Sequence, residues 1–168
     1  MNDYDVTSLQ GEEKENLIKY LSLLKTEFWE VNDFINSLKN CKPYALDVAE
    51  ASAVQKALDM AVVISYARNF KTSRGFEISK KINDKLISDF TDKELALHKK
   101  KIDERDQEFA HSDASAHDVQ VELDELYSFS KLRVRQPLER EELETLQSMT
   151  TKIRNQIDII LKELIEEK

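Results

Sequence analysis

Hydrophobic residues recur at intervals of three and four along two long stretches of the chain, the spacing that keeps side chains on one face of an α-helix. The first stretch predicts a helix from about Glu12 to Lys39. Its apolar positions are Leu17, Leu21, Leu24, Phe28, Val31, Ile35 and Leu38. The second predicts a last helix that opens at Pro137 and runs nearly to the end of the chain. Its apolar positions are Leu143, Leu146, Met149, Ile153, Ile157, Ile160 and Leu164.

Two further helices are predicted between these stretches. Pro43 suits the first turn of a helix that reaches Asn69, and the alanines of this segment would let a neighbouring helix approach closely. Residues 71–75 then break the pattern, and the apolar positions of residues 78–90 predict a shorter helix, with an ordered loop as the alternative.

A capping box marks the start of another helix. In Thr91-Asp92-Lys93-Glu94 the threonine hydroxyl can accept a hydrogen bond from a backbone N–H while the glutamate reaches back to the cap. This helix is expected to end between Ala110 and Asp113. Beyond it, alternating apolar and polar residues predict a small β-hairpin between about Asp118 and Arg135.

Composition supports a single helical domain. The 168 residues include only 2 Gly and 2 Pro, too few turn formers for a sandwich or barrel, and no glycine-rich loop of the kind that binds phosphate in nucleotide-binding folds. We therefore predict an all-α fold, an antiparallel up-and-down bundle of about four main helices, with residues 1–168 as one domain and residues 1–11 flexible.

Charge and hydropathy place limits on the environment and partners. The formal net charge is −8, and the longest unbroken apolar run, residues 60–64, is far shorter than the roughly 18 residues of a membrane span. No signal peptide is expected at the N-terminus. The single cysteine, Cys41, cannot form an internal disulfide. We expect a cytoplasmic protein with no membrane partner.

One helical stripe contains charged and polar residues where apolar ones are expected. Leu95, Ile102 and Phe109 share their stripe with His98 and Arg105. Because burying an unpaired guanidinium costs several kcal/mol, Arg105 needs either an acidic partner or a water-filled cleft. A salt bridge across the bundle, or a position at its rim, is the structural alternative to a functional site.

The segment from Arg105 to His111 resembles the signature of the HEPN superfamily of helical domains. In that signature an arginine, usually followed by a polar residue, is separated from a histidine by four to six intervening residues; here five intervene and Asp106 is the polar one. The following Ser112 and Asp113 complete an ending similar to that of HEPN-like bacterial proteins related to abortive infection. Similarity to that branch extends to residues 66–70 and 97–98.

The resemblance implies metal-independent RNA cleavage. His111 would act as acid or base, Arg105 would bind phosphate and Asp106 would orient them. Six helical steps leave Arg105 and His111 about 120° apart, so either the helix bends or a second copy completes the site, and we predict a homodimer. RNA and an antitoxin protein are the other expected partners, in a defence or toxin-type system.

The same resemblance makes Arg68, His98 and Tyr66 candidate substrate-binding residues, with a core tyrosine as the alternative for Tyr66. Lysines 99–101 form a local basic patch or a solvated face. The histidines lack metal-ligand spacing, so no metal and no cofactor are predicted. The alternative to an RNA-binding nuclease is a catalytically inactive helical interaction module, which the acidic sequence favours.

Overall fold

The computed structural model describes Val6 and residues 9–71, 80–106, 120–123, 128–131 and 136–166. Its helices are α1 (Gly11–Lys39), α2 (Ala53–Arg68), α3 (Lys80–Leu86), α4 (Asp92–Glu104) and α5 (Arg140–Glu166). Two four-residue strands, β1 (Gln120–Leu123) and β2 (Ser128–Lys131), form an antiparallel pair with Gln120 opposite Lys131. They lie inside the range 118–135 in which the sequence predicts a hairpin. The predicted all-α class is confirmed.

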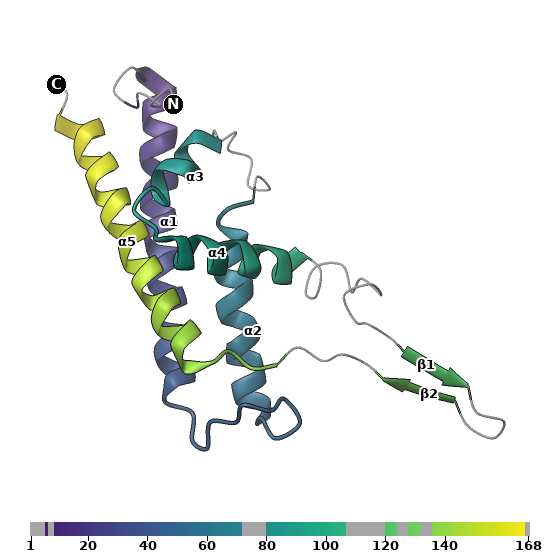
Figure 1. Cartoon of the computed structure of the whole chain (residues 1–168). Helices are drawn as coiled ribbons and strands as arrows, with labels where there is room; N and C mark the ends of the chain where they lie inside the picture. The colour runs from purple at the N-terminus through teal and green to yellow at the C-terminus, as the bar shows by residue number, and fades with distance from the viewer. Residues whose placement is uncertain are drawn as a thin grey trace.

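The three long helices lie side by side in alternating directions. In Figure 1, α1 occupies the middle, with α5 on one side and α2 on the other, and both run antiparallel to α1. Helix α4 instead lies across this layer and contacts both α2 and α5. The up-and-down arrangement therefore holds for α1, α2 and α5, whereas α4 crosses them.

The core forms where the two long apolar stripes meet. All fourteen stripe residues of α1 and α5 predicted from the sequence are buried. They pack with Val62, Val63 and Tyr66 of α2. The periodicity of these two helices was therefore sufficient to identify the central part of the core.

Helix α2 starts ten residues later than Pro43 predicts, because a side chain takes the place of helical backbone bonds. The Gln55 side chain is fully buried and bonds both backbone groups of Ala45, at 3.0 Å to the nitrogen and 2.6 Å to the oxygen. Ser52 then caps the helix by accepting a hydrogen bond from the Gln55 N–H at 3.1 Å. The predicted start of this helix was wrong, while its end near Asn69 was confirmed.

Helix α4 has the predicted capping box but buries a different face. The Thr91 backbone N–H donates to Glu94 at 2.8 Å, and the Thr91 hydroxyl accepts from the Glu94 N–H at 3.3 Å. Leu95, predicted to face the core, is 40% exposed, whereas Leu97 and Lys101 are buried. The buried face is therefore rotated relative to the predicted stripe, and the predicted helix end at residues 110–113 lies outside the described residues.

Two apolar side chains from the start of the chain belong to the core or pack on it. Val6 is buried within the core cluster, and Leu9 packs against that cluster. Gly11 already belongs to α1. Burying an apolar side chain such as Val6 removes its surface from water, which stabilises the fold.

Candidate functional site

The ends of α2 and α4 meet at a small cluster of charged side chains, formed by Lys71, Arg105 and Asp106. One carboxylate oxygen of Asp106 accepts a hydrogen bond from Arg105 Nη1 at 2.9 Å, and the other contacts the ammonium of Lys71. The three side chains are between 27% and 34% exposed, so each remains accessible to solvent. The cluster carries two positive charges and one negative charge.

Asp106 stays ionised in this cluster. The hydrogen bond from Lys71, supported by the one from Arg105, lowers the pKa of Asp106 below its usual value of 3.8. Its carboxylate therefore holds two cations that come from different helix ends. The orienting role of Asp106 stays a prediction, because His111 lies outside the described residues.

Tyr66 and His98 lie together inside the contact between α2 and α4. The Tyr66 hydroxyl and His98 Nδ1 share a hydrogen bond of 2.8 Å. The His98 ring also meets Phe70 edge-on, with ring centroids 4.5 Å apart, and lies 6.1 Å from Phe90. Burial raises the pKa of Tyr66 well above its usual value and lowers the pKa of His98 to about 4, so both side chains are neutral at pH 7.

This packing corrects the substrate-binding prediction for Tyr66. The residue has no exposed surface, so its hydroxyl is not offered to a ligand. His98 is half-buried among aromatic rings and bonded to Tyr66. The core alternative holds for Tyr66, and the neutral His98 side chain in this structure stabilises the contact between the two helices.

Arg68 points to acidic residues of α1. Its Nη2 lies 3.8 Å from a carboxylate oxygen of Glu27 and 3.8 Å from one of Glu30. Its Nε is buried and has no hydrogen-bond partner among the described residues. Because two carboxylates already face this guanidinium, the structure does not bring Arg68 into a common cationic group with Arg105.

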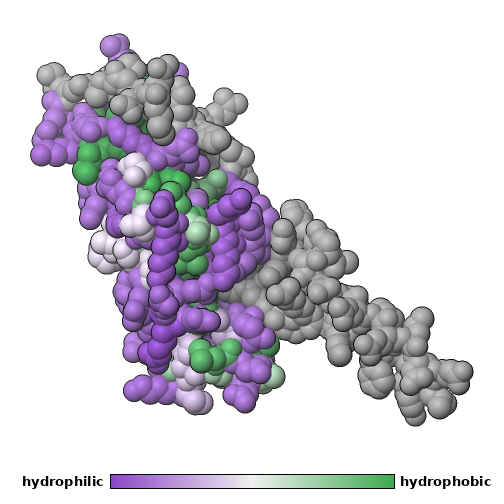
Figure 2. All heavy atoms as spheres, in the orientation of Figure 1, coloured by the Kyte–Doolittle hydropathy of each residue, from purple (hydrophilic) through white to green (hydrophobic). Residues whose placement is uncertain are grey.

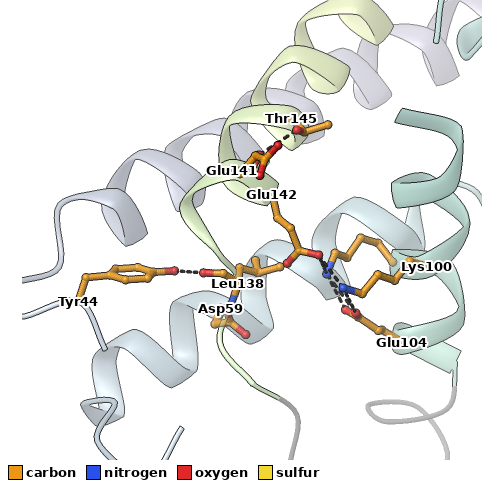
Figure 3. Close-up of polar contacts among 9 residues, drawn as sticks. Tyr44, Asp59, Lys100, Glu104, Leu138, Glu141, Glu142 and Thr145 are labelled. Carbon is orange, nitrogen blue, oxygen red and sulfur yellow. Dashed lines mark hydrogen bonds and ion pairs between the residues drawn. The ribbon is translucent and has the colours of Figure 1, made fainter. Parts of the chain in front are cut away.

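A second ionic cluster, which the sequence did not reveal, joins α4 to the start of α5 (Figure 3). Lys101 is only 1% exposed, and its Nζ lies 3.0 Å from Glu104 and 3.5 Å from Glu142. Lys100 binds the same Glu142 oxygen at 2.6 Å. The basic patch predicted from lysines 99–101 is therefore wrong for Lys101, which lies four residues after the buried Leu97 on the true inner face of α4.

The same region fixes the chain just before α5. The Leu138 N–H donates to Asp59 Oδ1 at 2.7 Å, and the Leu138 carbonyl accepts from the Tyr44 hydroxyl (Figure 3). Asp59 is 4% exposed and Leu138 1% exposed. Both backbone groups of a buried residue are thus satisfied by side chains from earlier parts of the chain, which gives these polar residues a structural function.

Neither metal chemistry nor a membrane span is suggested by the described part of the chain. It contains no group of three or more His, Cys, Asp or Glu side chains positioned to hold a metal ion. None of its helices has the length and apolar character needed to cross a membrane. Comparison with protein families, curated proteins and solved structures gave no match to this chain.

Proposed function

We propose that the chain is a HEPN-like RNA-binding homodimer that cleaves RNA without a metal ion. Arg105 binds the phosphate and His111 serves as acid or base. The observation that carries the proposal is the contact of Asp106 with both Arg105 and Lys71, which supports a preorganised cationic group immediately upstream of the histidine. The resemblance of residues 105–111 to the HEPN signature supplies the reaction class.

The cluster has the charge that phosphate recognition requires. Two cations and one carboxylate leave a local charge of about +1 in a chain whose formal charge is −8. A guanidinium has five N–H donors, so a contact through Nη1 can orient the group while other donors meet phosphate oxygens. Asp106 thus fixes Arg105 without neutralising the cluster.

The proposed chemistry is transfer of the phosphate to the neighbouring ribose oxygen. A neutral His111 takes the proton of the 2′-hydroxyl, the 2′-oxygen attacks phosphorus, and the bond to the 5′-oxygen breaks. The 5′-oxygen takes a proton from the protonated His111 of the second copy in the dimer. Arg105 stabilises the negative charge that develops on the phosphate oxygens, and the products are a 2′,3′-cyclic phosphate and a 5′-hydroxyl.

The test compares variants of two arginines on a labelled structured RNA in EDTA. Arg105→Gln is expected to lower the slope of log affinity against log salt by about 1 and to reduce cleavage by about 100-fold or more. Arg140→Gln, in the exposed first turn of α5, is the matched control and should leave both unchanged. Equal RNA binding and cleavage by wild type and Arg105→Gln would reject the proposal.

The Asp106→Asn variant tests whether RNA affinity rises or falls when the carboxylate charge is removed. The amide oxygen can still accept from Arg105, but the local charge rises from about +1 to about +2. We expect tighter RNA binding at low salt, because phosphate contacts depend on the cations that face them. Unchanged or weaker binding by a folded Asp106→Asn variant would mean that the cluster does not face RNA.

A helical interaction module is the second candidate. It is favoured by the contacts of Tyr66, His98 and Arg68, since all three predicted substrate-binding residues have partners within the fold. This function predicts a folded protein with no RNA affinity at low salt and no effect of Asp106→Asn on RNA. The same experiments therefore separate the two functions.

A further inference from the structure

Lys71 is brought to the end of α4 by the packing of the residue before it. The chain leaves α2 in a further turn, in which the Lys71 N–H donates to the last carbonyl of α2 at 3.2 Å. The Phe70 ring packs against both helices, with its centroid 5.4 Å from that of Tyr66 on α2 and 4.5 Å from that of His98 on α4. Packed side chains therefore fix the backbone from which the Lys71 ammonium reaches Asp106.

The balance of charge around Lys71 differs from that of every other ion-pair group between described residues. The two lysines of the cluster between α4 and α5 share two carboxylates, and Arg68 faces two carboxylates. The remaining pairs join one cation to one carboxylate. Only where Lys71 and Arg105 share Asp106 do cations outnumber carboxylates. An exposed ion pair contributes little to stability, so the second cation is not needed to hold the helix ends together.

The surrounding surface gives this local excess of cations its importance. Hydrophilic side chains cover most of the described surface that is visible in Figure 2. In a chain with 33 acidic and 25 basic residues, such a surface repels a polyanion on average. RNA can therefore approach most closely where cations are in excess, and Lys71 supplies one of the two positive charges of the cluster.

The contacts of Asp106 show how one anion meets both cations. Its Oδ1 binds the guanidinium of Arg105 at 2.9 Å, and its Oδ2 binds the ammonium of Lys71. A phosphodiester has two non-bridging oxygens on one phosphorus, which can divide between two cations in the same way. An ammonium has three donors and a guanidinium five, so both cations keep donors for a phosphate while Asp106 stays bound. The two cationic side chains are 33% and 27% exposed, which leaves them accessible from solvent.

We infer that Lys71 is a second phosphate-binding residue of the proposed site, and that Lys71 and Arg105 contact the same phosphate of the RNA, the one at which cleavage occurs. The inference rests on the proposed function and adds to it a residue outside the HEPN-like segment 105–111. With Asp106 on one side and the phosphate on the other, each cation lies between two anions. The two positive charges thereby offset the repulsion between the Asp106 carboxylate and the phosphate.

RNA binding by charge variants of the full chain tests the role of Lys71. The probe is a short RNA that contains the cleaved sequence, with a 2′-deoxyribose at the cleavage position to prevent the reaction. Lys71→Gln is expected to lower the slope of log affinity against log salt by about 1, and Lys71→Arg to retain the wild-type slope. Lys56→Gln is the matched control and should also retain it, because Lys56 is exposed at the opposite end of α2. Equal slopes for wild type and Lys71→Gln would overturn the inference.

A double-mutant comparison separates contact with RNA from support of Asp106. In an Asp106→Ala background the carboxylate that Lys71 holds is gone, so a residue that acts only through Asp106 has no effect there. We expect Lys71→Gln to lower the salt slope by about 1 in this background as well. If the slope stays the same, Lys71 serves only to hold Asp106 and the inference is wrong.

An RNA with one uncharged phosphate tests whether the two cations share it. The probe is the same RNA with a methylphosphonate in place of the phosphate at the cleavage position. Lys71→Gln and Arg105→Gln should each bind this RNA with the same salt slope as wild type, because the charge that both residues meet is already absent. A slope that Lys71→Gln still lowers by about 1 would mean that Lys71 contacts another phosphate, and the shared contact would be overturned.

The outcomes distinguish this inference from the proposed function. RNA binding that Arg105→Gln weakens and Lys71→Gln does not would overturn the inference and leave the proposed function in place. RNA binding and cleavage that neither substitution changes would reject the proposed function, and the inference with it.

Discussion

Removing the charge of Lys101 should destabilise the fold far more than removing that of any surface lysine. The Lys101 ammonium is almost completely buried between Glu104 at 3.0 Å and Glu142 at 3.5 Å. In Lys101→Met the apolar stem of the side chain is retained, so the packing volume changes little. What is lost is the cation that compensates two carboxylates at the junction of α4 and α5.

The size of this stability loss depends on how well solvent and Lys100 still compensate the charges of Glu104 and Glu142. Breaking a fully buried ion pair typically costs about 3–5 kcal/mol. Here the carboxylates keep some solvent, with side chains 14% and 21% exposed, and Lys100 still binds Glu142 at 2.6 Å. Burial opposes ionisation of Glu142, but the hydrogen bond from Lys100 and the charge of Lys101 keep its pKa below the usual value. We therefore expect a loss of about 2–3 kcal/mol, below the range for a fully buried pair.

Urea unfolding followed by circular dichroism measures this loss. Lys19→Met is the control, because Lys19 and Glu15 form an exposed pair at 3.8 Å with side chains 68% and 71% exposed. Such a pair contributes less than about 0.5 kcal/mol. If Lys101→Met changes the free energy of unfolding no more than Lys19→Met does, the buried cluster is not a stabilising element and the reasoning is refuted.

Three further predictions concern polar groups that are buried or half-buried in the fold. His98, with a pKa of about 4 instead of 6.5, contributes stability that is present above pH 6.5 and lost as the pH falls toward 4; His98→Gln should remove about 2–3 kcal/mol of that pH dependence in urea unfolding. For Glu94, burial raises the pKa but hydrogen bonds from Lys152, Thr91 and Ser148 bring it down to about 2, so its contribution is present above pH 4.5 and lost as the pH falls to 2; Glu94→Gln should flatten acid unfolding in that window. Asp59→Ala leaves the buried Leu138 N–H without its acceptor and should cost about 1–3 kcal/mol in thermal or urea unfolding, while Asp59→Asn, which keeps an oxygen there, should cost less. A Gln or Ala variant that matches wild type in its own assay would contradict the corresponding prediction.

The parts of the fold that could be predicted are those governed by repeated local spacing. The stripes of α1 and α5 extend over many turns, so one misleading residue cannot change the face that they predict, and all their apolar positions are buried. The short α4 has fewer turns, and there Leu95 misled the assignment because Glu94 and Lys101 are buried through partners on α5. A charged residue can be buried because a residue far away in the sequence neutralises it, and no local sequence pattern predicts this.

The prediction that α2 starts at Pro43 was wrong for a related reason. Pro43 and the alanine-rich segment after it satisfy every local criterion for a helix, yet the backbone of Ala45 is bonded by the Gln55 side chain instead. A glutamine amide has both a donor and an acceptor, so it can replace both backbone bonds of one residue at once. That substitution depends on the three-dimensional path of the chain, which propensity does not contain.

At the candidate site, a charged residue among apolar stripe positions correctly indicated that an acidic partner is needed. Arg105 on an apolar stripe suggests an acidic partner, and a salt bridge across the bundle was one expectation; the partner is Asp106, the next residue. The contact across the fold is made by Lys71, a second cation, through the same carboxylate. If Asp106 served only to neutralise Arg105, recruiting a second cation would leave an excess of positive charge at the helix ends with no structural use. That excess is what an anionic ligand would complement, and the opposite responses expected for Arg105→Gln and Asp106→Asn follow directly from it.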